Sequence, residues 1–268
     1  MNWKENIPLW KNLLQQPDFA LVTDVDGTIS PIVDIPNAAV VHPKIKPLLA
    51  ELRAQLPVVA VISGRRAADV QERVDIPGLI YIGNHGLERI TEDKVVIPKQ
   101  VSAFQETLAA AAREVRPHLL PGMTLEDKAI TLTIHYRQAP PGTPIDQDFT
   151  PFIEQLARRS GLKLFHGRKI FELRPPIEID KGTAFTSLLE ENQAQAAIYL
   201  GDDTTDAAAL NAARALRSAG KCQAYAIGVL STNTPKAVKD NADYFADGVE
   251  DVAAFFSLLL NSSKASFT

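Results

Sequence analysis

Two aspartates near the start of the chain follow directly after a short apolar stretch. The stretch covers residues 19–23, and Asp24 and Asp26 come next, followed by Gly27. Side chains two residues apart on a strand point to the same side, so we expect the two carboxylates to face one pocket. Two like charges this close are costly unless a cation lies between them or one carboxylate takes up a proton. The pattern indicates a strand that ends at a chemical site, although a simple acidic turn would have the same residues.

Apolar runs alternate with amphipathic segments along much of the chain, which predicts parallel strands connected by helices. After the first strand, we expect strands at 57–62, 79–82, 197–200, 223–230 and 243–246, and helices at 44–56, 66–74, 182–191, 205–215 and 252–260. The pattern differs between residues 100 and 177, where we expect helix 101–115, two strands within 123–137, helix 151–160 and a hairpin within 162–173. We therefore predict a Rossmann-like α/β core (1–99 and 178–268) with an inserted α+β cap domain (100–177).

Polar residues follow three of the predicted core strands, and a lysine opens a helix. They are Asp24 with Asp26, Ser63, Asp202 with Asp203 and Asp206, and Lys181. Ligands of open parallel sheets bind beyond the carboxyl ends of the strands, so these groups are expected to share one site. Carboxylate oxygens suit Mg²⁺, and attack of a carboxylate on phosphorus gives an aspartyl-phosphate.

Each of these residues also has a simpler interpretation when it is taken alone. Ser63 fits a turn at a strand end, and Lys181 fits a solvated charge at a helix start. Asp203 and Asp206 fit caps of the following helix, because acidic residues are favoured in the first turn. His85 fits a hydrogen-bonded turn as well as the wall of a site. Only the order of the four groups along the chain favours a shared site.

The composition limits the class of protein further. With 46% hydrophobic residues, 22% charged residues and a net charge of −4, the chain is expected to be globular and to lack a nucleic-acid partner. The single cysteine, Cys222, excludes an internal disulfide and fits a reducing compartment. The first twenty residues show no signal-peptide core, and the apolar run 252–260 is far short of the roughly 20 residues that span a bilayer. We expect a cytoplasmic monomer without a membrane partner.

Four segments in this order resemble the signature of the haloacid dehalogenase-like phosphohydrolases. They are Asp24–Ile29, Ile62–Ser63, Lys181 and Gly201–Asp206. The resemblance implies a core of haloacid dehalogenase type in which Asp24 is the nucleophile and Asp26 the general acid and base. It implies that Ser63 and Lys181 hold the phosphoryl group. It also implies that Mg²⁺ is bound by Asp24, the Asp26 carbonyl and Asp202, with Asp203 and Asp206 around these ligands.

Seven further motifs resemble the trehalose-6-phosphate phosphatases. They are Asp26–Val33, Ile62–Arg65, Gly83–Gly86, Leu125–Lys128, His135–Arg137, Glu172–Pro175 and Asp180–Gly182. The resemblance implies that four cap residues hold the sugar: Glu126, Lys128, Arg137 and Glu172. It also implies that two core residues, Arg65 and His85, line the entrance of the sugar site. The alternating charges of the cap strands also fit any solvated sheet face. One departure is that Ala207 and Ala208 follow Asp206, where the family usually has a Glu-Asp pair.

The function expected from this resemblance is hydrolysis of trehalose 6-phosphate, with a small-molecule sugar phosphate as partner. Two alternatives stay open at this point. One is a phosphatase for another sugar phosphate, of the sucrose or glucosylglycerol type. The other is a non-catalytic module that binds a phosphosugar, although such decay is expected to remove the nucleophile, the acid or the lysine, and all three are present.

Overall fold

The computed structural model describes residues 1–33, 38–167 and 169–264. It divides into two compact units, one formed by 1–96 with 179–268 and the other by 97–178. Within the described residues, no helix has both the length and the apolar character needed to cross a membrane.

The larger unit contains an eight-stranded sheet in the order β12-β11-β10-β1-β2-β3-β4-β5. Six strands are parallel, and β4 and β5 are added antiparallel at one edge. The strands are β1 (Phe19–Thr23), β2 (Val58–Ile62), β3 (Ile80–Gly83), β4 (Glu88–Thr91), β5 (Lys94–Val96), β10 (Ala196–Gly201), β11 (Gln223–Val229) and β12 (Tyr244–Ala246). The α/β fold with a mostly parallel sheet is confirmed.

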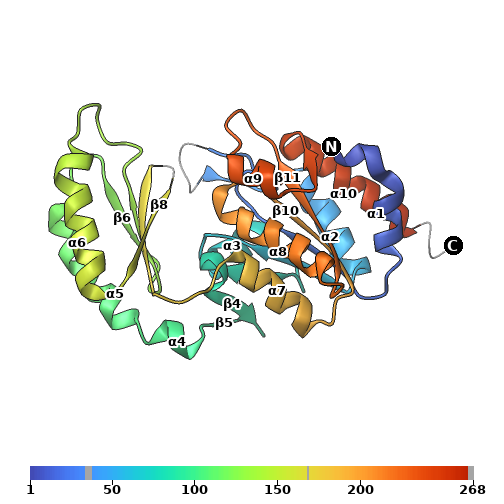
Figure 1. Cartoon of the computed structure of the whole chain (residues 1–268), viewed down its shortest axis with the longest axis horizontal. Helices are drawn as coiled ribbons and strands as arrows, with labels where there is room; N and C mark the ends of the chain where they lie inside the picture. Colours follow the sequence, from blue (N-terminus) through green and yellow to red (C-terminus); the bar gives the residue numbers. More distant parts are fainter. Residues whose placement is uncertain (34–37, 168, 265–268) are drawn as a thin grey trace. The chain divides into compact units, whose positions relative to one another are not determined.

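Helices cover both faces of this sheet (Figure 1). Alternate residues of β1 divide between two cores, because Phe19 and Leu21 pack on one face and Ala20 and Val22 on the other. The first face is covered by α1 (Ile7–Leu14), α2 (Ile45–Gln55), α3 (Ala67–Val74) and α10 (Gly248–Lys264). The second is covered by α7 (Lys181–Glu191), α8 (Ala207–Ser218) and α9 (Lys236–Asn241).

The smaller unit is a four-stranded antiparallel sheet in the order β6-β7-β9-β8, with helices packed on one face. Its elements are α4 (Lys99–Ser102), α5 (Gln105–Val115), β6 (Thr124–Asp127), β7 (Leu132–His135), α6 (Thr150–Ser160), β8 (Lys163–Gly167) and β9 (Ile170–Arg174). Leu132, Ile134, Phe171 and Leu173 of the sheet pack with residues of α5 and α6. The helix expected at 101–115 is wrong in one respect, since α4 ends before α5 begins.

Several elements of the larger unit lie outside the prediction, and helix α9 is one of them. Helix α1 and the 3₁₀ turn before it (Trp3–Asn6) pack on the sheet through Trp3 and Trp10. Strands β4 and β5 form a hairpin whose turn residues, Glu92 and Asp93, both have positive φ angles of 50° and 58°. A turn of that geometry usually contains Asn-Gly or Asp-Gly, so this hairpin has no recognisable sequence signal.

Candidate active site

Asp24 and Lys181 form a buried ion pair at the carboxyl end of the sheet. Asp24 follows the last residue of β1, and its backbone N–H donates to the carbonyl of Leu200 on the neighbouring β10 (2.9 Å). Lys181 is the first residue of α7, and its Nζ donates to Asp24 Oδ1 at 2.8 Å and to Asp206 Oδ1 at 2.7 Å. Asp24 and Lys181 are only 4% and 2% exposed, so their charges are held in a low-dielectric site. The structure thus brings the two residues together.

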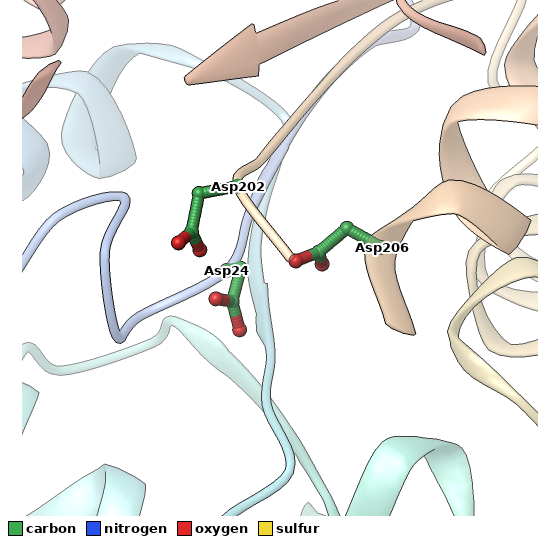
Figure 2. Close-up of side chains that lie close together, drawn as sticks. All are labelled: Asp24, Asp202 and Asp206. Atoms are coloured by element: carbon green, nitrogen blue, oxygen red, sulfur yellow. The ribbon is translucent and has the colours of Figure 1, made fainter. Parts of the chain in front are cut away.

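A third carboxylate, from Asp202, completes an acidic cluster. One oxygen each of Asp24, Asp202 and Asp206 lies within 4.8 Å of the others. Asp202 follows the last residue of β10, and Figure 2 shows the carboxyl group of Asp206 pointing toward those of Asp24 and Asp202. All three side chains are buried. Two further donors hold the Asp206 carboxylate, because it accepts hydrogen bonds from the Tyr199 hydroxyl (2.6 Å) and the Asp203 backbone N–H (3.1 Å).

The charges of this cluster do not balance within the protein. Burial and the neighbouring Asp206 raise the pKa of Asp24, and burial and Asp24 raise the pKa of Asp202. Burial acts to lower the pKa of Lys181, but the carboxylates of Asp206 and Asp24 raise it by more than burial lowers it. This side chain therefore stays an ammonium. Three buried carboxyl groups therefore face one ammonium, and the raised pKa values of Asp24 and Asp202 mean that all three ionise together only with further positive charge. A hard divalent cation fits this donor set, since it would supply the missing charge and prefers carboxylate oxygens.

Asp26 is held by an arginine rather than by the acidic cluster. Arg65 Nε donates to Asp26 Oδ2 at 2.6 Å, and Arg65 Nη2 donates to Asp26 Oδ1 at 2.8 Å. This two-pronged geometry fixes the carboxylate more firmly than a single contact. Arg65 was expected to line the sugar entrance, and in this structure its guanidinium is engaged with Asp26.

Ser63 and His85 lie at the ends of the next two strands of the sheet. Ser63 follows β2, is 1% exposed, and its Oγ accepts from the Arg65 backbone N–H at 3.2 Å. His85 follows β3 in a left-handed conformation, with its backbone N–H donating to the Ser63 carbonyl at 2.9 Å. A Cβ on Gly64 would lie 2.6 Å from the His85 ring, so the ring packs against this glycine. Ser63 and His85 are thus neighbours at the ends of two adjacent strands.

Gly27 is required where the chain turns away from Asp26. Its φ is +88°, a conformation that residues with a Cβ rarely adopt. A Cβ placed there would lie 2.1 Å from Asp202 Oδ2. The Thr28 hydroxyl is 3.4 Å from Asp202 Oδ1. The turn after Asp26 therefore leaves space for the Asp202 carboxylate.

The smaller unit places charged side chains on the sheet face that its own helices leave uncovered. Glu126, Thr133 and Glu172 are in register across β6, β7 and β9, so their side chains share this face. Glu172 is 3% exposed and lies 3.9 Å from the ammonium of Lys128, which is 8% exposed. Glu126, which is exposed, contacts His135 at 2.9 Å, while Arg137 is exposed beyond the end of β7. Three of the four predicted sugar-binding residues thus lie on or beside one face.

Two residues near the site were missed from the sequence. Tyr199 lies in an apolar run that predicts only a strand residue, although its hydroxyl donates a hydrogen bond to Asp206. Glu88 is 5% exposed, and its carboxylate accepts from the first N–H of α3, that of Ala67, at 2.7 Å. An acidic residue after a Gly-rich turn was the only signal available for Glu88. Asp203 forms the reciprocal cap with Asp206 that was considered for both residues, while Asp206 also binds Lys181.

The comparisons with known proteins identify the family of this chain. The family model described as trehalose-phosphatase matches residues 22–250. The chain belongs to the trehalose-phosphatase family. The match includes most of the larger unit, all of the smaller one and every site residue described in this subsection.

One curated relative of the chain is the trehalose-phosphate phosphatase of Mycobacterium marinum, which is 37% identical over 207 residues. That alignment covers 74% of this chain and 52% of the relative. The Mycobacterium avium protein of the same name is 34% identical over 257 residues, covering 93% of this chain and 61% of that one. The chain therefore spans between about half and three fifths of the length of these relatives.

Two solved structures share the fold. The C-terminal domain of Candida albicans trehalose-6-phosphate phosphatase superposes with a TM-score of 0.76 at 22% identity, covering 96% of this chain and 97% of that domain. A trehalose-6-phosphate phosphatase related protein gives the same TM-score and identity, covering 92% of this chain and all of the other. At this identity the two structures establish the fold.

Proposed function

We propose that this chain hydrolyses trehalose 6-phosphate to trehalose and inorganic phosphate. The observation that carries the proposal is the buried Asp24–Lys181 pair beside Asp202 at the carboxyl end of the sheet. The family match supports the substrate class. A paired carboxylate and ammonium without exposure to solvent is expensive to maintain, which favours a chemical role over a structural one.

In the first half-reaction, an Oδ of Asp24 attacks phosphorus. The bond between phosphorus and the sugar oxygen breaks, and Asp26 gives a proton to the leaving sugar oxygen, so that trehalose departs with its hydroxyl restored. Lys181 and Ser63 hold the phosphoryl oxygens while this happens. The Lys181 ammonium also keeps the Asp24 carboxylate oriented, because it donates a hydrogen bond to Oδ1.

In the second half-reaction, water attacks the phosphorus of the aspartyl-phosphate. Asp26 accepts a proton from this water, phosphate leaves, and the Asp24 carboxylate is regenerated. One residue thus donates a proton in the first step and accepts one in the second. Asp26 suits both steps because it follows Asp24 by two residues and its carboxylate is more exposed than that of Asp24.

Mg²⁺ is the cofactor that we propose. Asp24, the main-chain carbonyl of Asp26 and Asp202 would hold it, with Asp203 and Asp206 around them. When bound, such an ion would neutralise charge on the cluster and on the phosphoryl group. Ala207 and Ala208 stand where the family usually has an acidic pair after Asp206, and the Tyr199 hydroxyl donates a hydrogen bond to the Asp206 carboxylate.

For the sugar, we propose contacts from the charged face of the inserted unit, as a substrate-specificity cap. Glu126, Lys128, Arg137 and Glu172 would bind its hydroxyl groups, since carboxylates accept and Lys or Arg donate in fixed directions. His85 and Arg65 would lie near its entrance. The division into core (1–99, 178–268) and cap (100–177), the monomeric state and a cytoplasmic location stay predictions.

Phosphate release from a panel of sugar phosphates tests the proposal. The purified chain is assayed with Mg²⁺ on trehalose 6-phosphate, sucrose 6-phosphate, a glucosylglycerol phosphate and glucose 6-phosphate. We expect kcat/KM to be highest for the trehalose ester by at least about tenfold, the size of effect that one or two lost sugar hydrogen bonds produce. Similar values for several unrelated sugars would reject the trehalose assignment.

The variant Asp24→Asn separates an enzyme from a binding module. It keeps the size of the side chain but removes the nucleophile, so turnover is expected to fall below detection while trehalose 6-phosphate still binds. Calorimetry with the variant measures that binding. A variant with turnover close to the wild type would contradict the covalent mechanism, and a wild type that binds the ester without turnover would favour the phosphosugar-binding module.

A further inference from the structure

Asp26 is the end of a row of four alternating charges that runs along helix α3. Arg65 donates to Asp26 from two of its guanidinium nitrogens, and the third nitrogen, Nη1, lies 3.3 Å from Asp69 Oδ2. Asp69 Oδ1 accepts from Arg73 Nε at 2.9 Å, and Arg73 Nη1 donates to the carbonyl of Ala39 at 2.9 Å. Each charge in the row therefore touches one of opposite sign.

The row is partly buried, which makes its contacts stronger than those of surface ion pairs. The side chains of Arg65 and Arg73 are 14% and 17% exposed, and that of Asp69 is 33% exposed. Burial acts to raise the pKa of Asp69, but the hydrogen bonds and charges of Arg73 and Arg65 hold it below its usual range. Asp69 is therefore a carboxylate that both arginines stabilise.

We propose that Asp69, braced by Arg73, is a positioning residue for Asp26. Asp69 holds the guanidinium of Arg65 in the one orientation in which two of its N–H groups meet the two oxygens of Asp26. This inference rests on the proposed function: when Asp26 carries the proton of the first step, one of its oxygens keeps a contact with Arg65 while the other presents the proton to the leaving oxygen. Within the described residues, the ion pairs of Asp69 are with Arg65 and Arg73 and not with the acidic cluster.

The physical reason for such a brace is the length of the arginine side chain. A guanidinium on three methylenes loses much rotational freedom when it is held, and one carboxylate at a turn is a weak anchor for it. A second carboxylate on the first turn of a helix is a rigid anchor, because Asp69 and Arg73 are four residues apart on α3 and face the same side. The brace transfers the rigidity of the helix to the turn that follows Asp24.

Two aryl phosphates without a sugar test this role. Phenyl phosphate releases phenol, whose pKa is about 10 like that of a tyrosine side chain, and so needs a proton donor. 4-Nitrophenyl phosphate releases a much weaker base and needs little help. The quantity measured is kcat/KM, because it covers only the steps up to departure of the leaving group. Neither ester can gain from a sugar contact of Arg65.

We expect Asp69→Asn to lower kcat/KM about tenfold for phenyl phosphate and less than about threefold for 4-nitrophenyl phosphate, a fraction of the 10²–10⁴ that a general acid supplies. Asp69→Glu, which restores the charge, is expected to recover most of the loss. The control is Asp75→Asn, which removes the same charge just beyond the end of α3 from an exposed carboxylate 3.5 Å from Lys46. This control is expected to leave kcat/KM unchanged for both aryl esters.

A second measurement uses trehalose 6-phosphate itself. If Asp69 acts through Arg65, the loss caused by Asp69→Asn is expected to disappear in an Arg65→Lys background, because lysine cannot bridge both carboxylates. Equal losses on the two aryl esters, or losses that multiply in the double variant, would overturn the inference. A wild type that hydrolyses none of the three esters would instead refute the proposed function.

Discussion

Replacing Gly27 by alanine adds one methyl group at the turn beside Asp202. The new Cβ would lie 2.1 Å from Asp202 Oδ2 and 2.4 Å from its Cγ. Real Cβ contacts are more than 3 Å, so one of the two groups must move by about 1 Å. The carboxylate is the softer of the two, because the backbone turn also carries Asp24 and Asp26 at fixed positions.

The size of the effect follows from two separate contributions. A residue with a Cβ in the left-handed region costs about 1–2 kcal/mol, partly offset by about 0.4–1 kcal/mol from a stiffer unfolded chain. A displacement of about 1 Å in a positioned site costs about 10²-fold in rate, or about 2.7 kcal/mol of activation free energy. We therefore expect a small loss of stability and a large loss of activity.

The assay compares Gly27→Ala with Gly220→Ala. Gly220 lies in the same unit with a φ of +66°, and a Cβ there would meet no atom within 4 Å. Gly220→Ala therefore carries the backbone strain without the clash. Both variants are expected to lower the melting temperature by a few degrees, at about 2–4 °C for each kcal/mol in a chain near this size. Only Gly27→Ala is expected to lose about 10²-fold in kcat/KM and to need more Mg²⁺ for half-maximal rate.

Equal activity of the two glycine variants would refute this reasoning. It would mean that Asp202 can shift without consequence, and hence that it is not a positioned ligand. If Gly27→Ala lost both stability and activity, unfolding alone could explain the lost activity. Activity is therefore measured well below the melting temperature of each variant.

Two further variants test the buried network around Asp206. Lys181→Met removes the shared ammonium and leaves buried carboxylates unpaired, so we expect a loss of about 3–5 kcal/mol in urea unfolding without added metal and no measurable turnover; a stability within 1 kcal/mol of the wild type would show that the pair is not buried as described. Tyr199→Phe removes one hydroxyl donor to Asp206, and we expect a loss of about 1.5–3 kcal/mol with a lower kcat; an unchanged unfolding midpoint would mean that solvent replaces this bond.

The parallel core was predictable because its signals are local and repeat. Each buried strand is a short run of Val, Ile, Leu and Ala, and the runs alternate with amphipathic helices. Polar residues at the strand ends were predictable for the same reason, since parallel topology brings the ends of β1, β2 and β10 to one edge. The sequence alone thus led to Asp24, Lys181 and Asp202 as neighbours.

Other features depend on contacts that no local pattern encodes. The β4–β5 hairpin turns on Glu92 and Asp93, which give no glycine signal. Tyr199 lies in an apolar run and differs from its neighbours only by a hydroxyl, whose partner comes from the following turn. The bond between Arg65 and Asp26 joins two motifs that were each assigned a separate role. Long side chains choose among several nearby partners, and sequence spacing does not decide between them.

The position of the insertion has a consequence for how the chain is made. On one side, β1 pairs from Ala20 onward with β2 from Val58 onward, and β2 is synthesised soon afterwards. On the other side β1 pairs with β10, which leaves the ribosome only after the whole insertion. Until then, Ala20 and Val22 lack the cover of α7 and α8. A nascent chain that ends within the insertion therefore exposes a half-finished sheet edge, a state in which newly made proteins are prone to aggregate.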